Sequence, residues 1–287
     1  MSAAVSKEIA RERPPFDVAW RKIDGLKIRY AMGGKKGEKV VLFSPWPESF
    51  FAFTQMWKGL TKRFDVLAVD LPGFGQSEAR DDLFSPHAMG DFIVKAIDAF
   101  GFQSSHAVAL DIGSPSVLYT ALARPDLFRS LIVGAGACTF PLVVEGHLKE
   151  TIEAATAPPL NAIEFVGGFV SRIRGYAVPT FVRDDYISSY AGDRMTRSEA
   201  LVRAYPTDLA ALAPKLASIQ LPVAIVVGRN DPFNLAHDAA LLREQLPHAR
   251  LDVLEAGHCF WEERSKDFEA IIKHWVRGGY SGVISAK

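Results

Sequence analysis

The sequence predicts an α/β fold with a mostly parallel sheet and helices on both faces. Short, wholly apolar runs of strand length, such as residues 40–43 and 223–227, alternate with segments whose apolar residues recur at helical spacing. Continuous apolar runs are typical of strands buried on both faces, as strands are in a parallel sheet. The chain has 287 residues, of which 48% are hydrophobic, and this suits one large α/β domain that carries an insertion.

The composition excludes several classes of partner. Because 33 basic residues balance 33 acidic ones, the net charge favours neither nucleic acid nor an anionic membrane surface. Cys138 and Cys259 lie far apart without a metal-type spacing, so neither a zinc site nor a disulfide framework is expected. No stretch resembles a signal peptide or a membrane span. We expect a cytoplasmic protein without metal or cofactor that binds a small apolar molecule; a homodimer stays open.

A polar arm at residues 1–15 precedes the first part of the α/β core, residues 16–139. Residues 18–23 and 26–30 predict two strands of a hairpin, because Asp24-Gly25 is a two-residue turn signal. The elements predicted after the hairpin are strand 40–43, helix 50–60, strand 65–69, helix 89–100, strand 106–110, helix 116–123 and strand 131–133. Strands that alternate with helices imply right-handed crossovers and parallel pairing.

The alternation breaks between residues 140 and 214, a segment rich in glycine and proline. Helical patterns at 144–154, 162–172, 184–191 and 198–204 predict that this segment is a helical cap inserted into the core. Phe165, Phe169 and Phe181 make the cap apolar, as an aromatic or polycyclic ligand requires. The second part of the core, residues 215–287, continues with strand 223–227, helix 236–245, strand 251–254 and a terminal helix at 266–276.

A sharp turn from a buried strand into a helix is predicted at Asp111. Ala109, Gly113 and Ser114 are the small neighbours that such a tight turn needs. The pattern fits a nucleophile elbow in which aspartate replaces the usual serine. A carboxyl group with an ordinary pKa near about 3.9 is already ionised at neutral pH, so Asp111 could attack without the help of a base.

Two further polar loops follow predicted strands, at the edge where open parallel sheets place their sites. Asp231 lies in the loop after the strand that ends at Val227, and His258 lies in the loop after the strand that ends at Leu254. The order of nucleophile, acid and histidine resembles the α/β-hydrolase superfamily from about residue 26 to the end of the chain. The aspartate at the elbow is similar to that of its epoxide hydrolase and haloalkane dehalogenase branch.

The resemblance implies a two-step reaction without a cofactor. Asp111 attacks an sp³ carbon and forms an alkyl ester, and water activated by His258, which Asp231 orients, then hydrolyses that ester. The oxyanion of the second step sits on Asp111 itself. Its donors should be the backbone N–H groups of Ile112 and Trp46.

Two motifs carry the resemblance with altered residues. Ser44-Pro45-Trp46-Pro47 looks like the His-Gly-x-Pro loop of epoxide hydrolases, which implies a cis bond before Pro47. The elbow resembles the family's His-Asp-x-Gly-Gly, with Leu110 in place of the histidine and Ser114 in place of the second glycine. These departures bear on the substrate more than on the mechanism.

The choice of substrate depends on the acid that protonates the leaving oxygen. The resemblance implies cap tyrosines: Tyr205 best matches one of the pair, and Tyr176 or Tyr186 could be the second. Dehalogenases place a side-chain N–H donor or an arginine directly after the nucleophile, and Ile112 supplies neither. We therefore expect an epoxide hydrolase that forms a vicinal diol, with Trp46, Ile112, Tyr176 and Tyr186 at the substrate. The alternatives are a haloalkane dehalogenase-type hydrolase and a hydrolase-fold binding protein without turnover.

Overall fold

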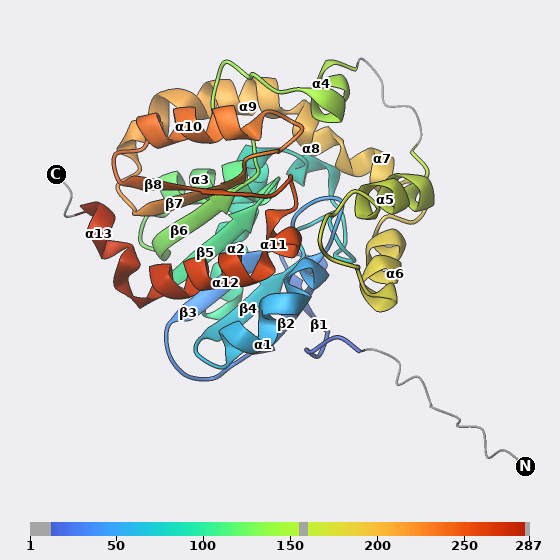
Figure 1. Cartoon of the computed structure of the whole chain (residues 1–287), viewed down its shortest axis with the longest axis horizontal. Helices are drawn as coiled ribbons and strands as arrows, with labels where there is room; N and C mark the ends of the chain where they lie inside the picture. Colours follow the sequence, from blue (N-terminus) through green and yellow to red (C-terminus); the bar gives the residue numbers. More distant parts are fainter. Residues whose placement is uncertain (1–12, 155–159, 285–287) are drawn as a thin grey trace, which may run out of the picture.

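The computed structural model describes residues 13–154 and 160–284 (Figure 1). The polar arm predicted at residues 1–15 therefore lies mostly outside the described residues. Within them, eight strands form one sheet. The strands are β1 (Ala19–Ile23), β2 (Leu26–Gly33), β3 (Lys39–Phe43), β4 (Asp65–Val69), β5 (Ser105–Leu110), β6 (Phe128–Gly134), β7 (Val223–Gly228) and β8 (Ala249–Leu254).

The sheet is mostly parallel. Its strand order is β1-β2-β4-β3-β5-β6-β7-β8; β2 pairs antiparallel with β1 and β4, and the other neighbours pair parallel. Asp24 and Gly25 join β1 to β2 with φ values of 50° and 86°, which a two-residue hairpin turn of this type needs. The predicted α/β fold is confirmed, and the carboxyl ends of its parallel strands meet at one edge of the sheet.

Helices cover both faces of the sheet (Figure 1). The helical elements of the core are η1 (Phe50–Phe53), α1 (Thr54–Thr61), η2 (Asp81–Leu83), α2 (Pro86–Phe100), α3 (Gly113–Ala123), α10 (Leu235–Gln245), α11 (Phe260–Glu263), α12 (Ser265–His274), η4 (Trp275–Gly279) and α13 (Ser281–Ile284). α1 packs against α12, and α2 packs against α3. Because both faces are covered, the central strands β5 and β7 are buried along their whole length.

The segment between β6 and β7, residues 135–222, is helical and contains the predicted cap; we call it the inserted segment. Its elements are α4 (Gly146–Glu153), α5 (Ala162–Val170), α6 (Thr180–Ser189), α7 (Arg194–Ser198), α8 (Ala200–Arg203), α9 (Tyr205–Leu212) and η3 (Ala213–Ser218). α9 departs from the prediction, in which the last helix of this segment ends at residue 204. Pro206 lies in the first turn of α9, where a missing N–H breaks no helical hydrogen bond.

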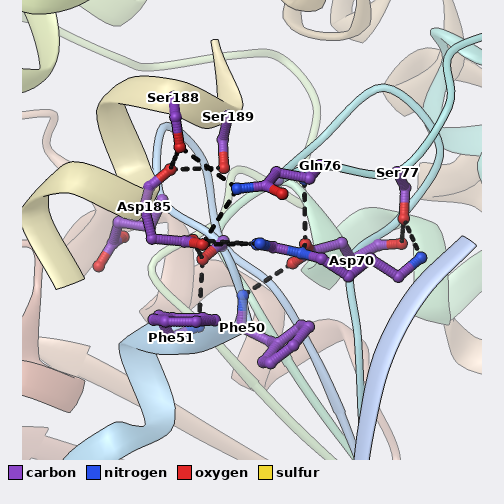
Figure 2. Close-up of polar contacts among 12 residues, drawn as sticks. Phe50, Phe51, Asp70, Gln76, Ser77, Asp185, Ser188 and Ser189 are labelled. Atoms are coloured by element: carbon purple, nitrogen blue, oxygen red, sulfur yellow. Dashed lines mark hydrogen bonds and ion pairs between the residues drawn. The ribbon is translucent and has the colours of Figure 1, made fainter. Parts of the chain in front are cut away.

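A buried network of charges joins the inserted segment to the core (Figure 2). Arg29 on β2 donates from Nε to Asp70 at 2.6 Å and from its terminal nitrogens to Asp185 on α6 at 2.6 and 3.0 Å. Ser49 and Gln76 also donate to Asp185. Leaving a buried charge without its partner typically costs about 3–5 kcal/mol, so this network holds α6 in one place on the core.

Candidate active site

Asp111 occupies a strained turn between β5 and α3. Its φ is 49°, a left-handed conformation that aspartate and asparagine tolerate better than most residues. The Asp111 N–H donates to the carbonyl oxygen of Gly134 at 2.8 Å, which ties the turn to β6. A Cβ atom on Gly136 would lie 2.3 Å from the Asp111 carbonyl oxygen, so only glycine fits there. The surrounding backbone therefore holds the aspartate at the carboxyl edge of the sheet.

Ser114, which replaces a glycine of the resembled motif, belongs to the frame of this turn. Its hydroxyl oxygen lies 3.0 Å from the carbonyl oxygens of Ala109 and Gly134, and it accepts the Gly134 N–H at 3.0 Å. The side chain is buried and fully engaged with backbone groups. Ser114 is therefore a structural residue that joins β5 to β6, and Asp111 is the polar residue at the apex of the turn.

The Asp111 carboxylate already accepts the two backbone donors predicted for the oxyanion. The Trp46 N–H donates to Oδ2 at 2.9 Å, and the Ile112 N–H also donates to the carboxylate. The peptide bond between Trp46 and Pro47 is cis, as predicted. The indole Nε1–H of Trp46 donates to Ser198 in the inserted segment at 2.8 Å, so this proton is not free for a ligand. The side chain of Ile112 is buried, so Ile112 reaches the site through its backbone.

His258 and Asp231 form the pair predicted from the two later loops. His258 Nδ1 donates to Asp231 Oδ2 at 2.8 Å, and Asp231 Oδ1 accepts the Phe233 N–H at 2.9 Å. The acceptor Asp231 fixes the tautomer, so the Nε2 atom of neutral His258 carries the lone pair. Nε2 lies 3.9 Å from Asp111 Oδ1, beyond a direct hydrogen bond. The three side chains therefore converge, with Oδ1 of Asp111 on the histidine side and Oδ2 against the Trp46 N–H.

Burial changes the acidity of both reactive groups. It raises the pKa of Asp111 to about 6, although the charge of His258 and the two backbone donors lower it in part. Burial lowers the pKa of His258, but the carboxylates of Asp231, Asp111 and Glu263 together outweigh burial and leave this pKa above its ordinary value. Asp111 therefore remains mostly ionised at neutral pH, with a smaller margin than its ordinary pKa implies.

A small apolar cavity lies over these groups, between the core and the inserted segment. Its volume is about 50 Å³, and Asp111, His258 and Trp46 lie in its wall. The inserted segment contributes Phe165 and Phe169, as well as the polar side chains of His147 and Thr151. Phe181, by contrast, packs against Phe51. A mostly apolar wall with a few polar groups is typical of a small-molecule site.

The three predicted tyrosines take different positions. Tyr205, the first residue of α9, is buried, makes no hydrogen bond to another described residue, and lies close enough to feel the charge of Asp111. Tyr186 is also buried, but its hydroxyl donates to Glu262 Oε1 at 3.1 Å. Tyr176 is half-buried and close enough to Tyr186 to influence it. None of the three lies among the residues that line the cavity.

Several cavity residues were not singled out by sequence patterns. His147 and Thr151 sit one helical turn apart on α4, with His147 Nε2 and Thr151 Oγ1 3.3 Å apart. Val202 comes from α8, and Phe233 packs edge-on against the His258 ring at a centroid distance of 4.9 Å. No motif surrounds these residues, and only the fold of the inserted segment brings α4 to the site. The one sequence feature that could have indicated Phe233 is its position two residues after Asp231.

Comparisons with known proteins agree with this architecture. A family model described as alpha/beta hydrolase fold matches residues 39–265. The solved structure of the epoxide hydrolase CorEH without ligand aligns with a TM-score of 0.71 over 91% of this chain and 99% of that chain, at 19% identity. At that identity the likeness concerns the fold alone. Within the described ranges, every helix is too short or too polar to span a lipid bilayer.

Curated relatives carry different names at low identity. The 3-oxoadipate enol-lactonase 1 of Acinetobacter baylyi is 21% identical over 265 residues, which are 88% of this chain and 94% of the relative. The soluble epoxide hydrolase of Corynebacterium sp. (strain C12) is 27% identical over 111 residues, which are 39% of this chain and 38% of the relative. The reaction must therefore be argued from the side chains of the site.

Proposed function

Because the chain belongs to the α/β-hydrolase fold family, we propose that it is a hydrolase that opens an epoxide to a vicinal diol through an ester on Asp111. The observation that carries this proposal is the orientation of the Asp111 carboxylate. Oδ2 accepts the Trp46 N–H, while Oδ1 faces His258 across 3.9 Å. Oδ1 is therefore the nucleophile, and Oδ2 becomes the carbonyl oxygen of the ester, already placed against the donors of its later oxyanion.

The two steps balance with the groups at hand. In the first, Asp111 Oδ1 bonds to an epoxide carbon, the C–O bond of the ring breaks, and the released oxygen takes a proton from an acid. In the second, His258 removes a proton from water, and the resulting hydroxide attacks the ester carbon of Asp111. Collapse of the tetrahedral intermediate releases the diol, whose leaving oxygen takes the proton from His258. The second proton of the water passes from the new carboxyl group of Asp111 back to the acid of the first step, which restores both groups.

Tyr205 is the acid that we propose for the first step. Its side chain is buried, its hydroxyl makes no hydrogen bond to another described residue, and burial, together with the charge of Asp111, raises its pKa well above the usual range. A tyrosine of that kind stays neutral and keeps its proton available to donate. Tyr186 is a weaker candidate because its hydroxyl is engaged by Glu262.

Two neighbouring reaction classes fit the site less well. Acyl transfer by the lactonase-like route uses a hydroxyl nucleophile, and the only hydroxyl in the described elbow, that of Ser114, is engaged by backbone groups. A halide needs N–H donors at the leaving-group position. The indole N–H of Trp46 is bonded to Ser198, and Ile112 has no side-chain donor.

The proposal is tested by product analysis with a panel of apolar epoxides and haloalkanes of matched size. Because Phe165 and Phe169 line a small cavity, we expect diol formation from compact apolar epoxides and no halide release. Halide release without diol formation would assign the site to dehalogenation instead. Ligand-induced thermal stabilisation without turnover, unchanged in Asp111→Asn, would assign the chain to the binding proteins.

The two half-reactions should differ in their dependence on pH. Ester formation needs ionised Asp111 and is lost as the pH falls through about 6, the raised pKa of this group. Ester hydrolysis needs neutral His258, whose pKa is raised above its ordinary value, so this step is lost first as the pH falls. We expect the alkylated fraction of the enzyme at steady state to rise between pH 8 and about pH 6.

Rapid quenching followed by mass spectrometry of the intact protein measures that fraction directly. Buffers of constant ionic strength serve as the control, because salt screens the charges that set both pKa values. An ester fraction that stays constant or declines as the pH falls would contradict the assignment of His258 as the base of the second step.

A further inference from the structure

Glu48 and Glu262 form a buried carboxyl pair behind the candidate active site. Glu48 follows Pro47 in the loop that supplies the Trp46 N–H, and Glu262 lies in α11, four residues after His258. Their exposed fractions are 0% and 2%, and the two carboxyl groups lie close enough to influence each other's pKa. The pair therefore joins the oxyanion loop to the histidine loop.

One oxygen of each carboxyl group has a donor, and the other has none. The Trp261 Nε1–H donates to Glu48 Oε1 at 3.0 Å, and the Tyr186 hydroxyl donates to Glu262 Oε1 at 3.1 Å. Both Oε2 atoms are buried, and neither accepts a hydrogen bond from another described residue. The nearby charges that act on the two groups belong to Asp111 and Glu263, which are acidic. The described residues offer no cluster of three or more ligands for a metal ion.

Two carboxylates in this position would be two unpaired, mutually repelling anions in a dry interior. We propose that Glu48 and Glu262 share one proton, which bridges their Oε2 atoms, and that the bridged pair is a positioning element that holds the Trp46 N–H and His258 in register. The positioning role rests on the proposed function, whereas the shared proton does not. A single proton satisfies both unpaired oxygens, because the protonated group donates and the ionised group accepts.

Once the pH has risen above the pKa of Asp111, about 6, the carboxyl groups of the pair are the next buried groups to titrate. The groups that face the pair are Asp111, Tyr186, Tyr190, Cys259 and Glu263. Burial raises the pKa of both tyrosines and of the cysteine well above their usual ranges, so these groups stay neutral. Burial also raises the pKa of Glu48 and of Glu262. Alkaline pH should therefore remove the bridging proton and push the two loops apart.

A cycle of glutamine substitutions tests the shared proton without any substrate. In Glu48→Gln or Glu262→Gln, the amide can donate to the remaining carboxylate, so each single variant should melt within about 2 °C of the wild-type chain. In the double variant, two NH₂ groups meet. Its melting temperature should therefore fall by at least about 4 °C more than the two single shifts added together. Glu244→Gln, on the exposed surface of α10, is the matched control.

Infrared spectroscopy gives an independent readout of the same proton. The wild-type chain and Glu244→Gln should show a carboxylic-acid C=O band at pH 8, where Asp111 is ionised, and both single variants of the pair should lack it. Additive melting shifts, or a band that survives in both single variants, would overturn the shared proton.

The pH profile tests the positioning role. With a substrate epoxide, the ester-formation rate of the wild-type chain should fall at alkaline pH, and this fall should disappear in the single variants because an amide cannot ionise. An alkaline limb that both variants retain would overturn the positioning role. If no epoxide is turned over, the proposed function fails, while the melting cycle and the infrared band still decide the shared proton.

Discussion

Asp111→Asn should abolish turnover, with a loss of at least ~10⁴-fold in kcat, because the variant lacks the ionised oxygen that forms the ester. Asparagine is the informative substitution at this position. It tolerates the left-handed backbone at φ 49°, and its side-chain oxygen can still accept the Trp46 N–H. Alanine at the same φ would strain the turn. A loss of activity in that variant could then come from misfolding rather than from the missing carboxylate. Initial rates of diol formation measure the effect, and the melting temperature confirms that the variant is folded.

Isotope labelling separates a covalent role of Asp111 from a role as a base. In a single turnover in oxygen-18 water, the label should enter the Asp111 carboxylate and should reach the diol only in later turnovers. Asp91→Asn, on the exposed surface of α2, serves as the control and should keep wild-type rates. A label that appears in the first diol would mean that water attacks the epoxide directly, with Asp111 as its base.

The fold and the convergence of three side chains could be predicted because they depend on local patterns and one topological rule. Asp111, Asp231 and His258 each follow a strand, and the strands concerned, β5, β7 and β8, are parallel members of one sheet. Parallel strands bring their carboxyl ends to the same edge, so residues far apart in the sequence converge. The structure brings these three groups together at 2.8 and 3.9 Å.

Two errors in the placement of helices share one physical cause. The predicted helix at 116–123 begins at Gly113 in the structure, and α9 begins at Tyr205, where no helix was predicted. Pro115 and Pro206 each lie in the first turn of these helices, where proline is tolerated because the first N–H groups have no helical partner. A prediction rule that ends a helix at every proline therefore misplaces the start of both helices.

Properties that depend on burial could not be predicted from the sequence. The ordinary pKa of aspartate describes Asp111 in water, whereas its position under the inserted segment raises the pKa to about 6. In the same way, a tyrosine in the predicted cap is only a candidate donor until its partner is known. Tyr186 donates to Glu262, and Tyr205 has no such acceptor among the described residues. Both facts depend on contacts between segments that are distant in the sequence.

His258→Gln should stop the reaction after its first half and trap the ester, with a fall of about 10²–10⁴-fold in turnover. Asp111 remains ionised and can still attack, but no base activates water for the second step. Glutamine can keep a donor toward Asp231, so the neighbouring loop should retain its shape. Mixing the variant with excess epoxide should give one equivalent of covalent adduct, which mass spectrometry of the intact protein and of the Asp111 peptide would locate.

The mass of that adduct also distinguishes an epoxide from a haloalkane, because the two reactions leave different parts of the substrate on Asp111. Ring opening of an epoxide adds the whole substrate to Asp111, since the released oxygen stays attached as a hydroxyl group. Attack on a haloalkane adds the alkyl group without the halogen. His237→Gln, an exposed change on α10, should accumulate no more adduct than the wild-type chain. An adduct at a residue other than Asp111, or full turnover by His258→Gln, would contradict the mechanism, because both steps are assigned to atoms that only these two side chains supply.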